Sequence, residues 1–176
     1  MKKISIGMLI AVSALFASGV FAEIKMPKIF GDNMMLQAGK PVKIWGSADP
    51  NAEVSVKFGD CEKSVKASDD GSWAVRLSSM RPDKTPKELV VFENGKEGKR
   101  IKNVLVGEVW VLGGQSNMEW RLIPTTDGEA AKARAKYPAL RYFTQPGGTF
   151  TPEKQFDTPE SSKWQEASPD TVARWS

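Results

Sequence analysis

The sequence predicts a β-sandwich over residues 23–103, followed from residue 104 by the start of an α/β domain. Two observations carry this prediction. The first part repeats short segments in which apolar and polar residues alternate, separated by turn residues. The second part opens with an almost continuous apolar run at residues 104–112, a pattern typical of a strand that is buried on both faces of a parallel sheet. The 176 residues are therefore expected to form two small domains.

The alternating segments predict the strands of the sandwich in order. They are residues 41–46, 53–58, 73–77 and 88–93. Turns are predicted at residues 49–51 and 69–72, where Asp, Pro, Asn and Gly gather. The pair Asn94-Gly95 follows the last of these strands and is a strong signal for a two-residue hairpin.

The second part is predicted to combine one strand, one helix and a long loop before the chain ends. Residues 129–136 favour a short exposed helix, residues 140–143 a strand, and residues 144–162 a loop. Ser168 and the two residues after it, Pro and Asp, are typical of the start of a further helix. A parallel strand needs parallel neighbours, which few of the following residues could supply, so the chain is expected to be the front part of a longer protein.

The N-terminus has the three parts of a secretory signal peptide. Lys2 and Lys3 precede an apolar run at residues 4–20, and a small-residue cleavage site ends at Ala22. A mature protein that begins at Glu23 and is periplasmic or extracellular is expected. The alternative is a retained membrane anchor, which needs a longer uninterrupted apolar segment.

The composition excludes several classes of site. The formal net charge is +4 without a basic cluster, so a nucleic-acid partner is not indicated. The chain contains no histidine, which excludes a Ser-His-Asp or Cys-His site within it, and no metal or other cofactor is expected. The single cysteine, Cys61, cannot form an intramolecular disulfide and is expected to pack as a small buried hydrophobic residue.

Ser116 is the candidate nucleophile. It follows the apolar run and the two glycines Gly113 and Gly114, an order that predicts a serine presented at a tight turn at the end of a buried strand. The Gly-x-Ser-x-Gly pattern of a nucleophile elbow is incomplete, because Met118 stands at the second glycine position. The alternative is a glycine-rich corner with an incidental serine.

A resemblance to a known family favours the catalytic reading. Residues 114–118 (Gly-Gln-Ser-Asn-Met), preceded by residues 106–110 (Val-Gly-Glu-Val-Trp), resemble the first block of SGNH-type carbohydrate esterases, and of the sialate O-acetylesterase family in particular. The other similar segments are residues 26–37, 42–46, 70–73, 163–165 and 168–176. The resemblance thus covers nearly all of the chain after the signal segment.

This resemblance implies an SGNH hydrolase, flavodoxin-like second domain and an enzyme that removes O-acetyl groups from sugars, with sialic acid as the named substrate. Ser116 would be the nucleophile. Gln115 and Asn117 flank it and would either bind substrate or fix the loop. The Asp-x-x-His pair that activates the serine in this family, and the remaining oxyanion-hole residues, would lie beyond Ser176.

A second function remains open, a non-catalytic carbohydrate-binding or interaction module in which Ser116 is idle. Trp45, Trp73 and Trp110 could stack on sugars, although core positions are the simpler expectation for tryptophans on short strands. An Asp-x-x-His motif further along the open reading frame would favour the enzyme. In either case the expected partner is a sugar, and for the enzyme this sugar is O-acetylated. Neither a nucleic acid nor, after cleavage of the signal peptide, a membrane is expected as a partner.

Overall fold

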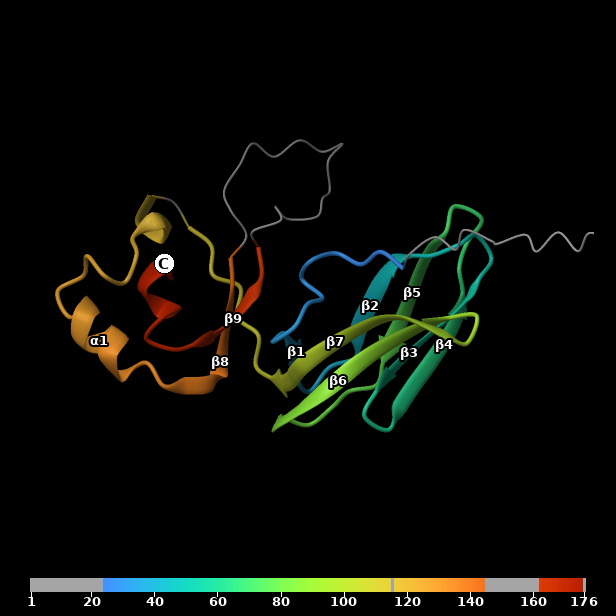
Figure 1. The fold of residues 1–176 in the computed structure, drawn as a ribbon, viewed down its shortest axis with the longest axis horizontal. Coiled ribbons are helices and arrows are strands. Elements are labelled where there is room, and N and C mark those ends of the chain that lie inside the picture. Colours follow the sequence, from blue (N-terminus) through green and yellow to red (C-terminus); the bar gives the residue numbers. More distant parts are fainter. Residues whose placement is uncertain (1–23, 115, 145–161, 176) are drawn as a thin grey trace, which may run out of the picture.

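The computed structural model describes residues 24–114, 116–144 and 162–175. The predicted signal peptide, residue 115 and nearly all of the predicted 144–162 loop lie outside the described residues. Most of the regular structure is β-strand, as the sequence predicts for the first part of the chain (Figure 1).

A curled five-stranded sheet and a two-stranded ladder make up the first part. The larger sheet has the order β1-β7-β6-β3-β4. Its strands are β1 (Met35–Gln37), β7 (Lys96–Gly107), β6 (Asp83–Glu93), β3 (Glu53–Phe58) and β4 (Cys61–Lys66). β2 (Val42–Ser47) pairs antiparallel with β5 (Ser72–Leu77). Both sheets contribute to one hydrophobic core.

The alternation in the sequence explains how the strands face this core. In β3, Val54, Val56 and Phe58 are buried, whereas Glu53 and Lys57 are exposed. β5 repeats the pattern at period two. Successive side chains of a strand point to opposite faces, so each strand buries one apolar row and leaves the other row in solvent.

The predicted hairpin is confirmed. Glu93 pairs with Lys96 across a two-residue turn, in which Asn94 has φ 49° and Gly95 has φ 77°. Two central residues with positive φ are the mark of a type I′ turn, whose twist matches that of the flanking strands. This turn joins the two longest strands of the molecule, β6 and β7.

The strand predicted at residues 104–112 is wrong in extent. Val104, Leu105 and Val106 are buried as expected, but they form the end of β7, which begins at Lys96 and so crosses the expected domain boundary at residue 103. β7 pairs parallel with β1 and antiparallel with β6. Residues 108–112 are not in a strand, because in the described part of the chain no neighbouring strand pairs with their backbone.

In its described residues, 116–144 and 162–175, the second part contains one α-helix, two paired antiparallel strands and two short 3₁₀ helices. Its elements are η1 (Ser116–Glu119), α1 (Gly128–Arg134), β8 (Tyr137–Phe143), β9 (Trp164–Ala167) and η2 (Val172–Arg174). α1 overlaps the helix predicted at residues 129–136 but ends at Arg134, and β8 contains the strand predicted at residues 140–143 but begins at Tyr137. A small core of Ala135, Ala167 and Val172 holds the elements together.

The helix predicted to begin at Ser168 is shorter and starts later. The hydroxyl of Thr171 donates to the carbonyl of Glu166 at 2.5 Å and accepts the N–H of Ser168 at 3.0 Å. Ser168 therefore belongs to a turn closed by Thr171 instead of capping a helix. Only the single 3₁₀ turn η2 follows, and such turns are ordinarily short.

A polar cluster and a tryptophan connect the two parts. Arg141 on β8 donates to Glu166 on β9 and to Asn103 on β7, and Asn103 in turn donates to Asn33. The indole N–H of Trp164 donates to the carbonyl oxygen of Ile29 at 2.7 Å. The β8–β9 hairpin is thereby attached to the end of the five-stranded sheet, as Figure 1 shows.

The tryptophans differ from the expectation that all three are core residues. Trp73 is buried, but Trp45 is partly exposed beside Phe30, and Trp110 is 78% exposed. Cys61 is half-buried and packs against the main core, so the expected burial is partial. In the part of the chain that the structure describes, no helix is both long and apolar enough to cross a membrane.

Candidate active site

The segment that leads from β7 to Ser116 is fixed at its start by Gln37. The backbone N–H of Val109 donates to Gln37 Oε1 at 3.0 Å, and Gln37 Nε2 donates to Glu108 Oε2 at 3.3 Å. Gln37 is the last residue of β1, which pairs with the end of β7 at Gly107. The chain therefore leaves the sheet in a defined direction, although it continues without strand pairing.

Ser116 is the first residue of η1, and it is exposed. Its expected place directly at the end of a buried strand is wrong, because β7 ends at Gly107. Gly114 has a clear steric role, since a Cβ there would lie 2.6 Å from Cγ of Met118. The absence of a side chain lets Met118 fold back over the turn, so Met118 contributes to the local packing around Ser116.

Gln115 and Asn117, the two neighbours of Ser116, were predicted either to bind substrate or to fix the loop. Gln115 lies outside the described residues. Asn117 is the second residue of η1, and its side chain lies outside the described part. Their assignment to substrate binding therefore stays a prediction.

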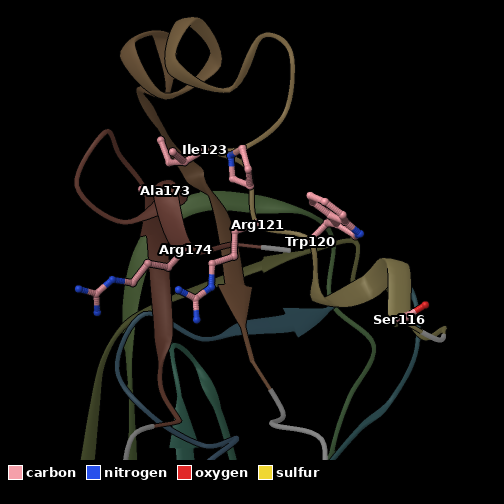
Figure 2. Close-up of a pocket in the computed structure, with 7 residues that line it drawn as sticks. Ser116, Trp120, Arg121, Ile123, Ala173 and Arg174 are labelled. Carbon is pink, nitrogen blue, oxygen red and sulfur yellow. The ribbon is translucent and has the colours of Figure 1, made fainter.

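Ser116 lies at the edge of an open hollow of about 710 Å³ (Figure 2). The other lining residues come from the segment after η1 and from η2: Trp120, Arg121, Ile123, Pro124, Ala173 and Arg174. A serine, a tryptophan and two arginines thus line one space. Such a combination of apolar surface with a few polar groups is typical of a small-molecule site.

Two contacts hold the walls of this hollow together. The N–H of Leu122 donates to the carbonyl of Trp175 at 2.9 Å, which joins the segment after η1 to the end of η2. Gly128 at the start of α1 lies against the same segment, and a Cβ there would lie 2.1 Å from the carbonyl oxygen of Leu122. Any larger residue at position 128 would displace the wall, so this glycine is required by close packing.

The described lining of the hollow is cationic and includes neither a histidine nor a carboxylate. Arg121 and Arg174 carry positive charge, and none of the described lining residues is acidic. A serine hydroxyl needs a group of suitable pKa to accept its proton, and the 176 residues include no histidine. The described residues also contain no group of three or more His, Cys, Asp or Glu side chains that could hold a metal ion.

The site predicted from the sequence contains none of the lining residues of the hollow except Ser116, and three of the missing six carry an aromatic or charged side chain. Trp120, Arg121 and Arg174 line it together with Ser116. Trp120 and Arg121 lie two and three residues after the end of the 114–118 block, which is the one signal that could have indicated them. Nothing in the sequence around Arg174 indicates that η2 folds back toward Ser116.

Comparisons with known proteins show which proteins this chain is similar to. No family model matches the chain. The sialate O-acetylesterases of Homo sapiens and Pongo abelii are each 34% identical to it over 90 residues, which cover 46% of this chain and 17% of the relative. A crystal structure described as a novel carbohydrate acetylesterase from Xanthomonas citri superposes with a TM-score of 0.80 at 34% identity.

The structural match covers 86% of this chain and 34% of the Xanthomonas citri protein. The 176 residues therefore span about a third of that solved relative and about a sixth of the curated ones. The sequence comparison and the structure comparison both find acetylesterases. The motif that contains Ser116 indicates the same class of enzyme. Over the part that it spans, the chain is similar to the sialate O-acetylesterases and to the carbohydrate acetylesterase.

Proposed function

We propose that this protein is an exported serine esterase that removes O-acetyl groups from carbohydrate, with an O-acetylated sialic acid as its substrate. The observation that carries the proposal is the exposed position of Ser116 at the rim of a hollow that a sugar could enter. The similarity to a sialate O-acetylesterase and to a carbohydrate acetylesterase supports the same reaction.

In this proposal the mostly-β first part is a β-sandwich, and the residues after it begin an SGNH-type, flavodoxin-like α/β domain. Residues 1–22 direct export and are removed. The β-sandwich supports the segment that carries the nucleophile, since Gln37 on β1 binds residue 109. The polar contacts of Arg141 attach the opposite wall of the hollow to the same sheet.

The reaction follows from the chemistry of a serine hydroxyl. Ser116 Oγ attacks the acetyl carbonyl carbon while a general base takes its proton, and the sugar hydroxyl leaves with a proton from the same base. Water then attacks the acetyl-serine, releasing acetate and restoring the hydroxyl. Backbone N–H groups at the start of η1, together with Gln115 and Asn117, would bind the developing oxyanion and the substrate.

The general base is proposed to come from residues outside these 176, because histidine is absent from them. The test is acetate release from O-acetylated sialic acid and from an aryl acetate by the product of the whole open reading frame. Ser116→Ala should abolish release, whereas Ser55→Ala, an exchange on β3 in the β-sandwich, should leave it intact.

Two outcomes would overturn the proposal. Unchanged hydrolysis by Ser116→Ala would remove the nucleophile assignment. Sugar binding without any acetate release from the whole open reading frame would favour the alternative, a non-catalytic carbohydrate-binding module.

A further inference from the structure

Two arginines that are distant in the sequence come together in the hollow beside Ser116. Arg121 lies just after η1, and Arg174 is the last residue of η2. The hydrogen bond from Leu122 N–H to the carbonyl of Trp175 joins their two segments. Figure 2 shows both side chains extending to the same side of the hollow, with Ser116 on its opposite side beyond Trp120.

These arginines differ from the others whose ion pairs the structure describes. Arg100 binds Glu88 and Glu97, and Arg141 binds Glu166. By contrast, no ion pair to Arg121 or Arg174 is found among the side chains that the structure describes, to which that of Glu119 does not belong. Two like charges held on one wall repel each other, and the repulsion is relieved when an anion binds between them.

We propose that Arg121 and Arg174 form a carboxylate-binding subsite, which selects acidic sugars over neutral ones at the site of Ser116. This inference rests on the proposed function, and it names the residues that would determine its specificity. Guanidinium groups suit this task, because their planar N–H donors match the two oxygens of a carboxylate. A phosphate would fit the charge as well, but the related enzymes are named for a sialate, which is a carboxylate.

The arrangement also orients the substrate. A carboxylate held by the arginine pair leaves the remainder of the sugar to extend across Trp120 toward Ser116, as the positions in Figure 2 indicate. The indole offers an apolar face against which a sugar ring can pack. The subsite would therefore place an acetyl ester that is remote from the carboxylate next to the nucleophile.

The test measures equilibrium binding, so that it does not depend on catalysis. The 176-residue chain is titrated with N-acetylneuraminic acid and with its neutral methyl ester, and the two dissociation constants are compared by NMR shift changes. A second pair, glucuronic acid and its methyl ester, separates a requirement for sialic acid from a general preference for acidic sugars. We expect each acid to bind about tenfold more tightly than its ester, as for a charge-assisted hydrogen bond in a partly exposed site.

Variants assign the preference to the two arginines. Arg121→Gln and Arg174→Gln should each reduce the ratio between acid and ester, and the double variant should bring it close to unity. Arg76→Gln, an exchange of an exposed arginine on β5, is the matched control and should leave the ratio unchanged. Added salt should weaken the binding of the acids more than that of the esters.

Equal affinities for acid and ester in the wild-type chain would overturn the subsite, as would absence of saturable binding of either acid. A preference that survives the double variant would overturn its assignment to these residues. The binding test does not depend on the identity of the nucleophile. If Ser116→Ala failed to abolish hydrolysis, the proposed function would be wrong, but a measured preference for acids over esters would still stand.

Discussion

Arg141 donates from Nη1 to Glu166 Oε1 at 2.5 Å, and Asn103 Nδ2 donates to the same oxygen at 2.6 Å. The guanidinium side chain is only 3% exposed, while Glu166 is 38% exposed. One carboxylate thus neutralises a buried cation and joins β8, β9 and the end of β7. This cluster attaches the hairpin that precedes η2 to the large sheet.

The two sides of this ion pair should respond differently to substitution. Arg141→Met keeps the apolar stem and leaves a carboxylate that water can reach. We therefore expect the free energy of unfolding to fall by about 1.5–3 kcal/mol, the value of a hydrogen bond to a charged group. Glu166→Gln changes the shape of the side chain less, but it leaves the buried guanidinium without a counter-charge. It should lower the free energy of unfolding by about 3–5 kcal/mol. Urea unfolding of both variants measures the difference. A smaller loss for Glu166→Gln than for Arg141→Met would contradict this account of the cluster.

The hairpin turn provides a prediction about backbone strain alone. Gly95 has φ 77° and nothing lies within 4 Å of a Cβ built there. Gly95→Ala should therefore lower the free energy of unfolding by about 1–2 kcal/mol, because an L-residue is strained in the left-handed region. Gly113→Ala is the control, since Gly113 is equally open and lacks a positive φ. Equal unfolding free energies for both variants would show that the turn relaxes.

Asp83 gives a pH-dependent contribution to stability. Its hydrogen bond with the Lys87 side chain, at 2.8 Å, lowers the pKa of Asp83 to about 2 from the ordinary 3.8. Because the folded pKa is depressed, the contribution is present above the unfolded pKa and is lost as the pH falls from about 4 to about 2. Lys87→Met should raise the carboxyl midpoint toward its ordinary value in an NMR titration. A midpoint near 4 in the wild-type chain would refute the contact.

The exposed apolar run after β7 predicts association of the chain with itself. Val111 is 95% and Leu112 66% exposed, next to Trp110. Adjacent exposed apolar side chains on unpaired backbone favour association. We expect a sedimentation coefficient that rises with concentration for the 176-residue chain, and a smaller rise for Val111→Lys. Val104→Lys, at a fully buried position, should instead unfold the first part. A coefficient independent of concentration in the wild-type chain would contradict the prediction.

The alternating pattern predicted β2, β3, β5 and the second half of β6, but it did not predict β1 or β4. β3 matches residues 53–58, and the Asn94-Gly95 turn follows from the backbone freedom of its two residues. The first half of β7 was missed because it is mostly charged and exposed. This half of β7 forms a strand because the hairpin turn brings it beside β6. The local pattern of apolar residues does not indicate such pairing.

The site was harder to predict than the sheet. Burial of residues 104–106 on both faces was inferred correctly, but periodicity cannot show whether a neighbouring strand exists for residues 108–112. The hollow depends on a tertiary contact between Leu122 and Trp175, and η2 follows a turn that Thr171 closes. The motif in the sequence indicated Ser116. The residues that surround Ser116 could be identified only from the folded chain.

The most direct measurement for the central claim is covalent trapping of the nucleophile. The product of the whole open reading frame is treated with a fluorophosphonate, which phosphonylates an activated serine, and the modified peptide is identified by mass spectrometry. Our account predicts one stoichiometric adduct on Ser116, loss of acetate release in step with labelling, and no adduct in Ser116→Ala. An adduct on a different serine, or full labelling of the alanine variant with the same loss of activity, would contradict the assignment of Ser116 as the nucleophile.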